Sequence, residues 1–223
     1  MKKVFSTLLA FTILLSLCAC GTQAPPSSPP ADTASQVSAQ STTRTHTDSM
    51  ERKVEIPSDV ERIVCVGVGA LRYSCYMDAA DLVVGVEDYE GKAGMSRLYN
   101  YVNFDKFKNL PVIGTNGEPN IEEIIAVNPQ VIVMSSYASA DADELQTKCG
   151  IPVVVVPGSD TTLDDKAYET IRIMGELYDK QARAQELTTY LKDIQKELND
   201  RTANIPESDK PSVYVGGVSF KGT

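Results

Sequence analysis

Histidine is scarce in this sequence, and its scarcity excludes several classes of function. The only histidine among 223 residues is His46. We expect a lone histidine at the end of a polar segment to be solvated rather than to hold a metal ion. Without a second histidine there is no Ser/His/Asp set, and no carboxylate pair carries a sequence signature of catalysis. The sequence therefore predicts a protein that is not an enzyme, with no catalytic residue, no cofactor and no resident metal.

Basic charge is also in short supply. The sequence has 21 Lys and Arg against 30 Asp and Glu, which gives a formal net charge of −9. A nucleic-acid-binding surface needs clustered positive charge to neutralise phosphates. The sequence shows no such cluster, so nucleic acid is excluded as a partner.

The first twenty residues have the features of a secretory signal. Two lysines precede an apolar segment, Val4–Leu17, that is too short for an easy membrane span. The following Leu17-Cys18-Ala19-Cys20 resembles a bacterial lipobox, in which the last cysteine is acylated and becomes the mature N-terminus. We predict a lipoprotein signal peptide over residues 1–20, lipidation of Cys20 and extracytoplasmic anchoring to the bilayer. Cleavage without lipidation is the alternative, and either event takes the formal charge to −11.

Residues 21–50 are rich in Pro, Ser, Thr, Ala and Gln and contain hardly any apolar side chain. Such a segment cannot bury enough surface to offset the entropy lost on ordering. We predict that it is a disordered tether between the membrane and the folded part of the chain.

From residue 51 onward, short apolar runs alternate with helical segments. Lys53–Pro57 alternates like an edge strand, whereas the later runs are continuously apolar, as expected for parallel strands covered on both faces. These later runs are Arg62–Gly67, Val83–Val86, Pro111–Gly114, Val131–Met134 and Val153–Val156. We predict an α/β fold, with a Rossmann-like, three-layer parallel-sheet lobe over residues 51–165. Ligands of such sheets bind beyond the carboxyl ends of the strands.

A long helical segment follows the lobe. Its apolar residues recur at helical spacing from Tyr168 to Ala203, and Asp179-Lys180 predicts a break. The part after the break, Gln181–Thr202, would be a rod about 33 Å long. We predict a strut over residues 166–205.

One glycine-rich turn has three possible interpretations. Gly67-Val68-Gly69, with Glu87 twenty residues later, imitates a dinucleotide fingerprint, although Arg72 replaces its third glycine. The turn could also be merely tight, with Arg72 solvated, or it could form an anion site with Arg72 at a helix start. The three cysteines beyond residue 50 have no zinc-site spacing, and the sequence leaves their redox state open.

A second motif carries a family resemblance. Residues 114–124 read G-T-x-x-x-P-N-x-E-x-I, and residues 128–133 read N-P-x-V-I-V. From about Lys53 onward the chain resembles the periplasmic binding proteins of ABC importers for iron chelates and vitamin B12. The resemblance implies two α/β lobes joined by a long helix, with the chelate between them. It also implies that residues 206–223 are the start of the second lobe and that this chain ends soon after the first strand of that lobe, Ser212–Gly217.

The resemblance also implies roles for individual residues. Glu122 matches the carboxylate that docks on the membrane permease, although an acid in a first helical turn is also favoured by the helix dipole. The residues expected to bind the ligand lie at or near the strand ends: Arg72, Tyr73, Arg97, Thr115, Ser136 and Tyr137. Arg and Tyr suit an anionic ferric chelate, and the lack of histidine disfavours a bare zinc or manganese ion.

The resulting hypothesis is a lipid-anchored binding protein that captures a ferric-siderophore-type ligand and delivers it to a permease. Heme or cobalamin is a less favoured ligand of the same scaffold. The alternative is a one-lobed remnant that binds no chelate and acts as a surface interaction module.

Overall fold

The structure, a computed structural model, describes residues 42–92, 97–158 and 163–214. The predicted signal peptide with Cys20, most of the predicted tether and most of the predicted Ser212–Gly217 strand lie outside these residues. Among the described residues, no helix is both long and apolar enough to cross a membrane.

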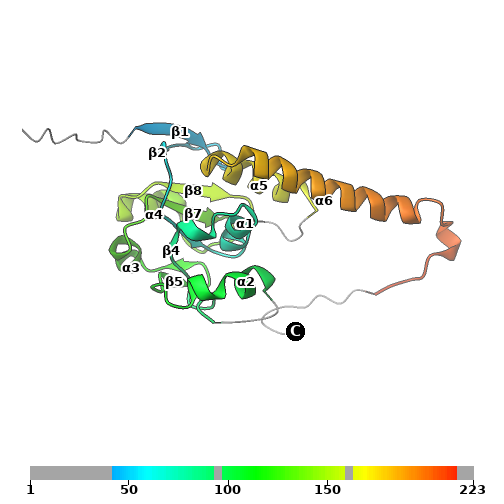
Figure 1. The fold of residues 1–223 in the computed structure, drawn as a ribbon, viewed down its shortest axis with the longest axis horizontal. Helices are drawn as coiled ribbons and strands as arrows, with labels where there is room; N and C mark the ends of the chain where they lie inside the picture. The colour runs from blue at the N-terminus through cyan, green and yellow to red at the C-terminus, as the bar shows by residue number, and fades with distance from the viewer. Residues whose placement is uncertain (1–41, 93–96, 159–162, 215–223) are drawn as a thin grey trace, which may run out of the picture. The chain divides into compact units, whose positions relative to one another are not determined.

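The centre of the fold is a four-stranded parallel sheet (Figure 1). Its strands, in spatial order, are β4 (Val83–Gly85), β3 (Ile63–Val66), β7 (Val131–Ser135) and β8 (Val153–Val156). Every residue of β3, β7 and β8 is buried. Burial on both faces explains why these strands are continuously apolar in the sequence. The predicted α/β fold with a buried parallel sheet is confirmed.

Helices cover both faces of this sheet, which makes three layers. Ile63 and Cys65 of β3 pack into one core with α1 (Ala70–Tyr76), α5 (Asp165–Leu177) and the end of α2 (Leu98–Phe107). The alternate residues Val64 and Val66 pack into the other core with α3 (Ile121–Ala126) and α4 (Ala142–Cys149). A short 3₁₀ turn, Ala80–Leu82, precedes β4, and another spans Glu207–Asp209.

The run Pro111–Gly114 does not form the short strand that the sequence predicts. It makes one parallel bridge, Val112 to Val86, with hydrogen bonds from the Val86 N–H to the Pro111 carbonyl and from the Ile113 N–H to the Val86 carbonyl. The chain then turns into a short antiparallel hairpin, β5 (Gly114–Thr115) and β6 (Glu118–Pro119). This hairpin ends the strand before it can extend the sheet.

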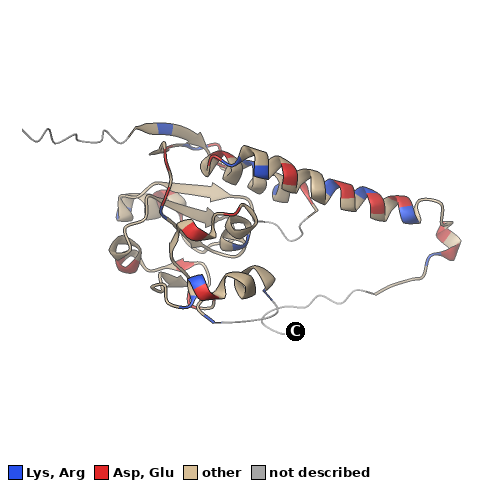
Figure 2. Ribbon diagram, viewed as in Figure 1, with Lys and Arg blue, Asp and Glu red and all other residues tan. Residues whose placement is uncertain are grey.

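The long helical segment forms two helices, as the sequence predicts. α5 ends at Leu177, Asp179 takes a positive φ of 54°, and α6 spans Gln181–Thr202. A Cβ on Gly175 would lie 2.6 Å from the Ala184 Cβ, so the two helices approach closely only because residue 175 is glycine. Basic and acidic residues alternate along α6 (Figure 2). Beyond the core the helix exposes apolar side chains, among them Leu198.

The prediction that residues 21–50 are wholly disordered is wrong at its C-terminal end. Thr43–Thr47 form β1, which pairs antiparallel with β2 (Lys53–Pro57). The inward-facing Arg44 donates to the carbonyls of Glu176 and Leu177 at the end of α5, at 2.9 and 2.8 Å. The Thr-Arg-Thr-His-Thr sequence alternates like a strand, but all its residues are polar, so composition alone concealed it.

His46 also differs from the expectation. It is 2 % exposed rather than solvated, because β1 places it against α5. Its Nε2 atom has no hydrogen-bond partner among the described residues. Burial lowers the pKa of the imidazole below its ordinary value, while Glu176 acts in the opposite direction.

Candidate ligand-binding site

The loops after β3 and β7 meet where the connections of the sheet change direction. β3 continues through α1 to β4 on one side, and β7 continues through α4 to β8 on the other. Ligands of open α/β sheets bind in the crevice at such a switch point. Here Gly67 has a φ of +85°, and a Cβ on it would lie 3.1 Å from the Ala138 Cβ. The two loops are therefore in contact at backbone level.

The turn of the β5–β6 hairpin completes this meeting point. A Cβ on Gly117, whose φ is +82°, would lie 3.1 Å from the Ala138 Cα and 3.5 Å from the Gly67 Cα. The Ser139 N–H donates to the Gly117 carbonyl at 3.1 Å. Three loops from distant parts of the sequence thus form one floor, and Gly67 and Gly117 are required for their close approach.

A single buried carboxylate ties these loops together. Glu87, at the carboxyl end of β4, is 2 % exposed. Its Oε2 accepts from the Gly67 N–H at 3.0 Å and from the Tyr89 hydroxyl at 3.1 Å. Its Oε1 accepts from the Gly117 N–H. Burial raises the pKa of Glu87 above its ordinary value, and the hydrogen bonds from Gly117, Tyr89 and Gly67 oppose that rise.

This geometry excludes the dinucleotide interpretation of the glycine turn. A ribose-binding acid must present its carboxylate to a ligand, but both oxygens of Glu87 are bonded within the chain. Gly67 leaves no room for a pyrophosphate, because Ala138 already packs against it. The turn is tight for packing, whereas the expectation that Arg72 is solvated in such a turn is not met, because Arg72 is half-buried.

Arg72 lies on α1 directly after this floor. Its guanidinium carbon is 5.2 Å from the centre of the Tyr73 ring. Arg72 is half-buried, and its Nε is buried without a hydrogen-bond partner among the described residues. Tyr73 itself is 2 % exposed and belongs to the core, so the expectation that it lines a ligand site is corrected.

Arg97 and a second buried carboxylate shape the neighbouring turn. Arg97 donates to the carbonyls of Tyr89 and Lys92, at 2.7 and 2.9 Å. Glu90 is 2 % exposed and accepts from the Tyr99 hydroxyl at 2.5 Å. Burial raises the pKa of Glu90 above its ordinary value. Through these contacts Arg97 stabilises the turn that contains Tyr89 and Lys92, in addition to its expected role in ligand binding.

Ser136 and Tyr137 follow β7 and are both exposed. The Ser136 hydroxyl accepts from the Gly158 N–H at 2.7 Å, which joins the loops after β7 and β8. The Tyr137 ring lies over Gly158, where a Cβ would come within 2.3 Å of it. Ser136 and Tyr137 therefore have fixed positions beside the floor, and the lack of a side chain at Gly158 leaves space for the Tyr137 ring. We call this edge of the floor, formed by the loops after β3 and β7, the rim.

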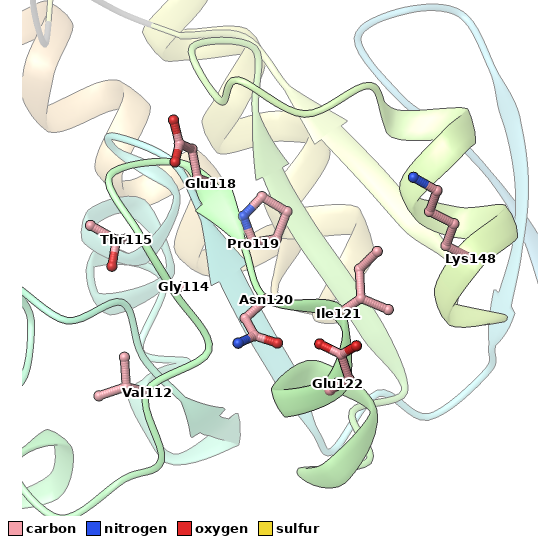
Figure 3. A pocket seen from close by; sticks show the side chains of 9 residues that line it. All are labelled: Val112, Gly114, Thr115, Glu118, Pro119, Asn120, Ile121, Glu122 and Lys148. Carbon is pink, nitrogen blue, oxygen red and sulfur yellow. The ribbon is translucent and has the colours of Figure 1, made fainter.

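Thr115 and Glu122 line a separate hollow of about 690 Å³ on the α3 side (Figure 3). In this view Glu122 lies between Val112 on one side and Lys148 of α4 on the other. Thr115 and Glu122 are exposed, and Asn120 caps α3 by accepting from the Glu123 N–H at 3.2 Å. The expected ligand-binding residue Thr115 and the expected docking residue Glu122 therefore line the same hollow.

The described residues contain no group of three or more His, Cys, Asp or Glu that could hold a metal ion. Cys65, Cys75 and Cys149 are free thiols, and burial raises the pKa of Cys65 and Cys75 to about 12. These two thiols are protonated at neutral pH and therefore poor nucleophiles.

Residues 76–222 match the Periplasmic binding protein family. The chain belongs to this family. Its members are transport binding proteins rather than enzymes, in agreement with the prediction, and the suspected family resemblance is confirmed.

Two curated relatives and two solved structures illustrate the likeness. The molybdate-binding protein MolA of Haemophilus influenzae is 26 % identical over an alignment of 188 residues that covers 76 % of this chain and 52 % of MolA. YvrC of Bacillus subtilis, an uncharacterised ABC transporter substrate-binding lipoprotein, is 23 % identical, covering 75 % of this chain and 50 % of YvrC. The molybdate-bound structure of MolA has a TM-score of 0.62 at 25 % identity, covering 74 % and 56 % of the two chains.

The structure of Staphylococcus aureus SirA with staphyloferrin B has a TM-score of 0.54 at 22 % identity, covering 72 % of this chain and 52 % of SirA. At this identity the likeness establishes the fold alone. The chain spans about half the length of the curated relatives it matches.

Proposed function

We propose that this protein is the solute-binding component of an ABC importer and that it captures an anionic, ferric-siderophore-type chelate at the strand-end rim. Membership of the Periplasmic binding protein family supports a transport role. The loops that meet at the switch point of the sheet supply a rim where a ligand can rest, since Glu87 and three backbone segments form a closed floor.

The main support for an anionic ligand is the environment of the Arg72 guanidinium. It is half-buried over an aromatic ring, with a buried Nε that no described residue accepts from. A buried donor without an acceptor is costly, and an anion is the partner that a guanidinium binds most strongly. An anionic ligand at the rim would supply the missing acceptor.

The surroundings of Arg72 favour a chelate with organic groups over a small bare ion. Val68 is 60 % exposed and Tyr137 is 44 % exposed on the loops that flank the floor. A planar ring and an exposed aliphatic side chain suit the aromatic or alkyl periphery of a chelate. Neither side chain offers a preferred ligand to a naked divalent metal.

A tetrahedral oxyanion is the second candidate, because the relative MolA is a molybdate-binding protein. Arg72 suits both ligands, since a guanidinium binds any compact anion. The two candidates differ in size, and only the chelate would reach Val68 and Tyr137 together.

Membrane attachment and delivery are further parts of the proposal. The lipobox-like sequence ending at Cys20 and the relative YvrC, a lipoprotein, support anchoring through an acylated Cys20. Glu122 is exposed on the first turn of α3, where it can meet an arginine of a permease. Its position suits docking, with the helix dipole as the competing reason for an acid there.

The test is a binding titration of the chain from Gly21, which retains β1. The chain has ten tyrosines and no tryptophan, so tyrosine fluorescence is the intrinsic signal, and calorimetry provides a second one. The probes are a ferric tris-catecholate, a ferric hydroxamate, ferric staphyloferrin B, molybdate, heme and cobalamin.

Saturable binding of one ferric chelate at micromolar or better affinity is the expected result. If molybdate alone binds, the proposed ligand is an oxyanion and not a chelate. A chain that is folded by circular dichroism and binds none of the six probes would contradict the proposal for this chain and favour a surface interaction module instead.

A further inference from the structure

Glu87 is a buried side chain that bonds to two loops of the candidate site at once. Its oxygens accept from the N–H groups of Gly67 and Gly117, which belong to segments fifty residues apart in sequence. Both glycines have positive φ and pack against Ala138. A shift of either loop would therefore move the other and would displace the start of α1, which carries Arg72.

We propose that Glu87 is the positioning residue of the ligand rim: its ionised carboxylate pins the Gly67 and Gly117 turns to each other and so fixes Arg72 and the rim loops in their binding geometry. This inference rests on the proposed function for its effect on binding, but the pinning itself is a property of the chain alone.

The chemistry of the carboxylate explains why ionisation matters. An ionised carboxylate presents acceptors only, and each oxygen serves one glycine N–H. A protonated Glu87 carries a hydroxyl, which can donate to the Tyr89 hydroxyl and is a weaker acceptor than a carboxylate oxygen. The bond to one of the two turns is then weakened, so the attachment loosens on one side.

Burial favours the protonated form of Glu87, because it raises the pKa of the carboxyl group. Any test must distinguish the titration of Glu87 from the titration of the ionisable groups that face it. These groups are Asp88 and Tyr89 on the same turn, Glu90 next to them, and Cys65 on β3. Glu90 is the matched control, because it is equally buried and its pKa is also raised, yet it bonds to Tyr99 and Asn100 instead of to the rim turns.

The experiment compares the full wild-type chain with Glu87→Gln and Glu90→Gln by hydrogen–deuterium exchange of the peptides that contain Gly67 and Gly117. Exchange rates are corrected for the intrinsic effect of pH and followed from about pH 7 to about pH 4, a range that covers carboxyl titration. The affinity of the probe that binds the wild type is measured for the same three proteins.

Glutamine has the shape of the protonated acid, with one acceptor oxygen and an NH₂ group. In Glu87→Gln we expect about tenfold or faster exchange in at least one of the two peptides, because a hydrogen bond to a charged acceptor is lost. The peptides from β8 and α5 should be unaffected. Probe affinity should fall about tenfold, since Arg72 and the rim loops lose their fixed positions.

The pH dependence of exchange distinguishes a positioning role of the ionised carboxylate from a purely structural role of the side chain. In the wild type and in Glu90→Gln, protection of the two turns should decline as the pH falls, whereas Glu87→Gln should show no such step. A step that survives in Glu87→Gln, or exchange that equals the wild type in both turns at pH 7, would overturn the inference. Unchanged probe affinity in Glu87→Gln, together with faster exchange in its two turns, would also overturn the inference.

Failure of the proposed function gives a different result. A wild-type chain that binds no probe contradicts the proposed ligand, while the exchange of the Gly67 and Gly117 peptides still decides whether Glu87 pins them.

Discussion

Asp48 docks the β1–β2 hairpin onto the sheet, and Asp48→Ala should weaken the whole fold. The side chain is fully buried, with 0 % exposure. It accepts from the backbone N–H groups of Met50, Arg52 and Val155, at 2.9, 3.1 and 3.2 Å. Its Oδ2 also accepts from the Arg52 guanidinium at 2.7 Å. The carboxylate therefore closes the hairpin turn and attaches it to β8.

The size of the effect follows from what the alanine would leave behind. Removing one partner of a buried ion pair costs about 3–5 kcal/mol, much of it from the groups left unpaired. The Val155 N–H would lose an acceptor in the core, but Arg52 would keep Asp143 at 2.6 Å and the Val153 carbonyl at 2.7 Å. The lower end, about 3 kcal/mol, is therefore expected. With a urea slope of about 2 kcal/mol per molar, the midpoint should fall by about 1.5 M.

The assay is urea unfolding followed by circular dichroism, with limited proteolysis to locate the loosened segment. Asp59→Ala is the control, because Asp59 is exposed and no hydrogen bond or ion pair of its carboxylate is found among the described residues. We expect early cleavage in residues 42–52 for Asp48→Ala alone. A midpoint within about 0.3 M of the wild type, with the hairpin still protected, would refute the reasoning.

Three further predictions concern binding, docking and pH. Arg72→Ala should weaken binding of the ferric-chelate probe at least about tenfold in a fluorescence titration, since a charge-assisted hydrogen bond is lost; equal affinity would remove Arg72 from the site. Glu122→Arg should abolish uptake in cells that depend on this importer while leaving probe affinity unchanged, and normal uptake would leave Glu122 with a helix-dipole role only. His46 has a lowered pKa, so its contribution to stability is present above about pH 6.5 and lost as the pH falls through the folded pKa. The free-energy difference between wild type and His46→Gln should therefore shrink on acidification, and a pH-independent difference would contradict this assignment.

The sheet was predictable because burial on both faces leaves a strong mark on sequence. Strands such as Ile63–Val66 and Val153–Val156 contain only apolar residues, and short runs of this kind between helical segments are typical of a parallel sheet covered on both faces. The long helix α6 was equally clear, since its 3.6-residue periodicity extends over six turns. In both cases one repeating physical requirement acts on many residues.

β1 was missed because its stabilisation comes from single contacts rather than from a repeated pattern. Its inward-facing residues are Arg44, which is half-buried and donates to carbonyls at the end of α5, and His46, which is buried. Both are polar and would be exposed in most sequences. Only the threonine alternation hinted at a strand, and Thr-rich composition is also typical of disordered linkers.

The candidate site was only partly predictable, and the reason is physical. The strand-end positions of Arg72, Ser136 and Tyr137 follow from the rule that ligands bind there. Tyr73 lies in the core because successive side chains of a helix point about 100° apart, so a residue next to Arg72 on α1 can face inward. The part that Glu87 plays could not be inferred, since both of its glycine partners bond through backbone N–H groups, which every residue but proline has. The available signal was an acid directly after an apolar strand together with two glycines in turns, and the same signal fits a dinucleotide site.

Asp48 and Glu87 show the same solution at two ends of the fold. Each is a buried carboxylate that collects backbone N–H groups from segments distant in sequence, at the hairpin in one case and at the rim in the other. Burying a charge is costly unless its lone pairs are filled, so such a residue is retained only where it fixes an arrangement that apolar packing leaves free. Two turns that meet through glycines have no side chains with which to lock each other, and a shared acceptor removes that freedom. The rim geometry therefore depends on an ionised group beneath the surface, and a substitution at Glu87 should alter binding even though Glu87 touches no ligand.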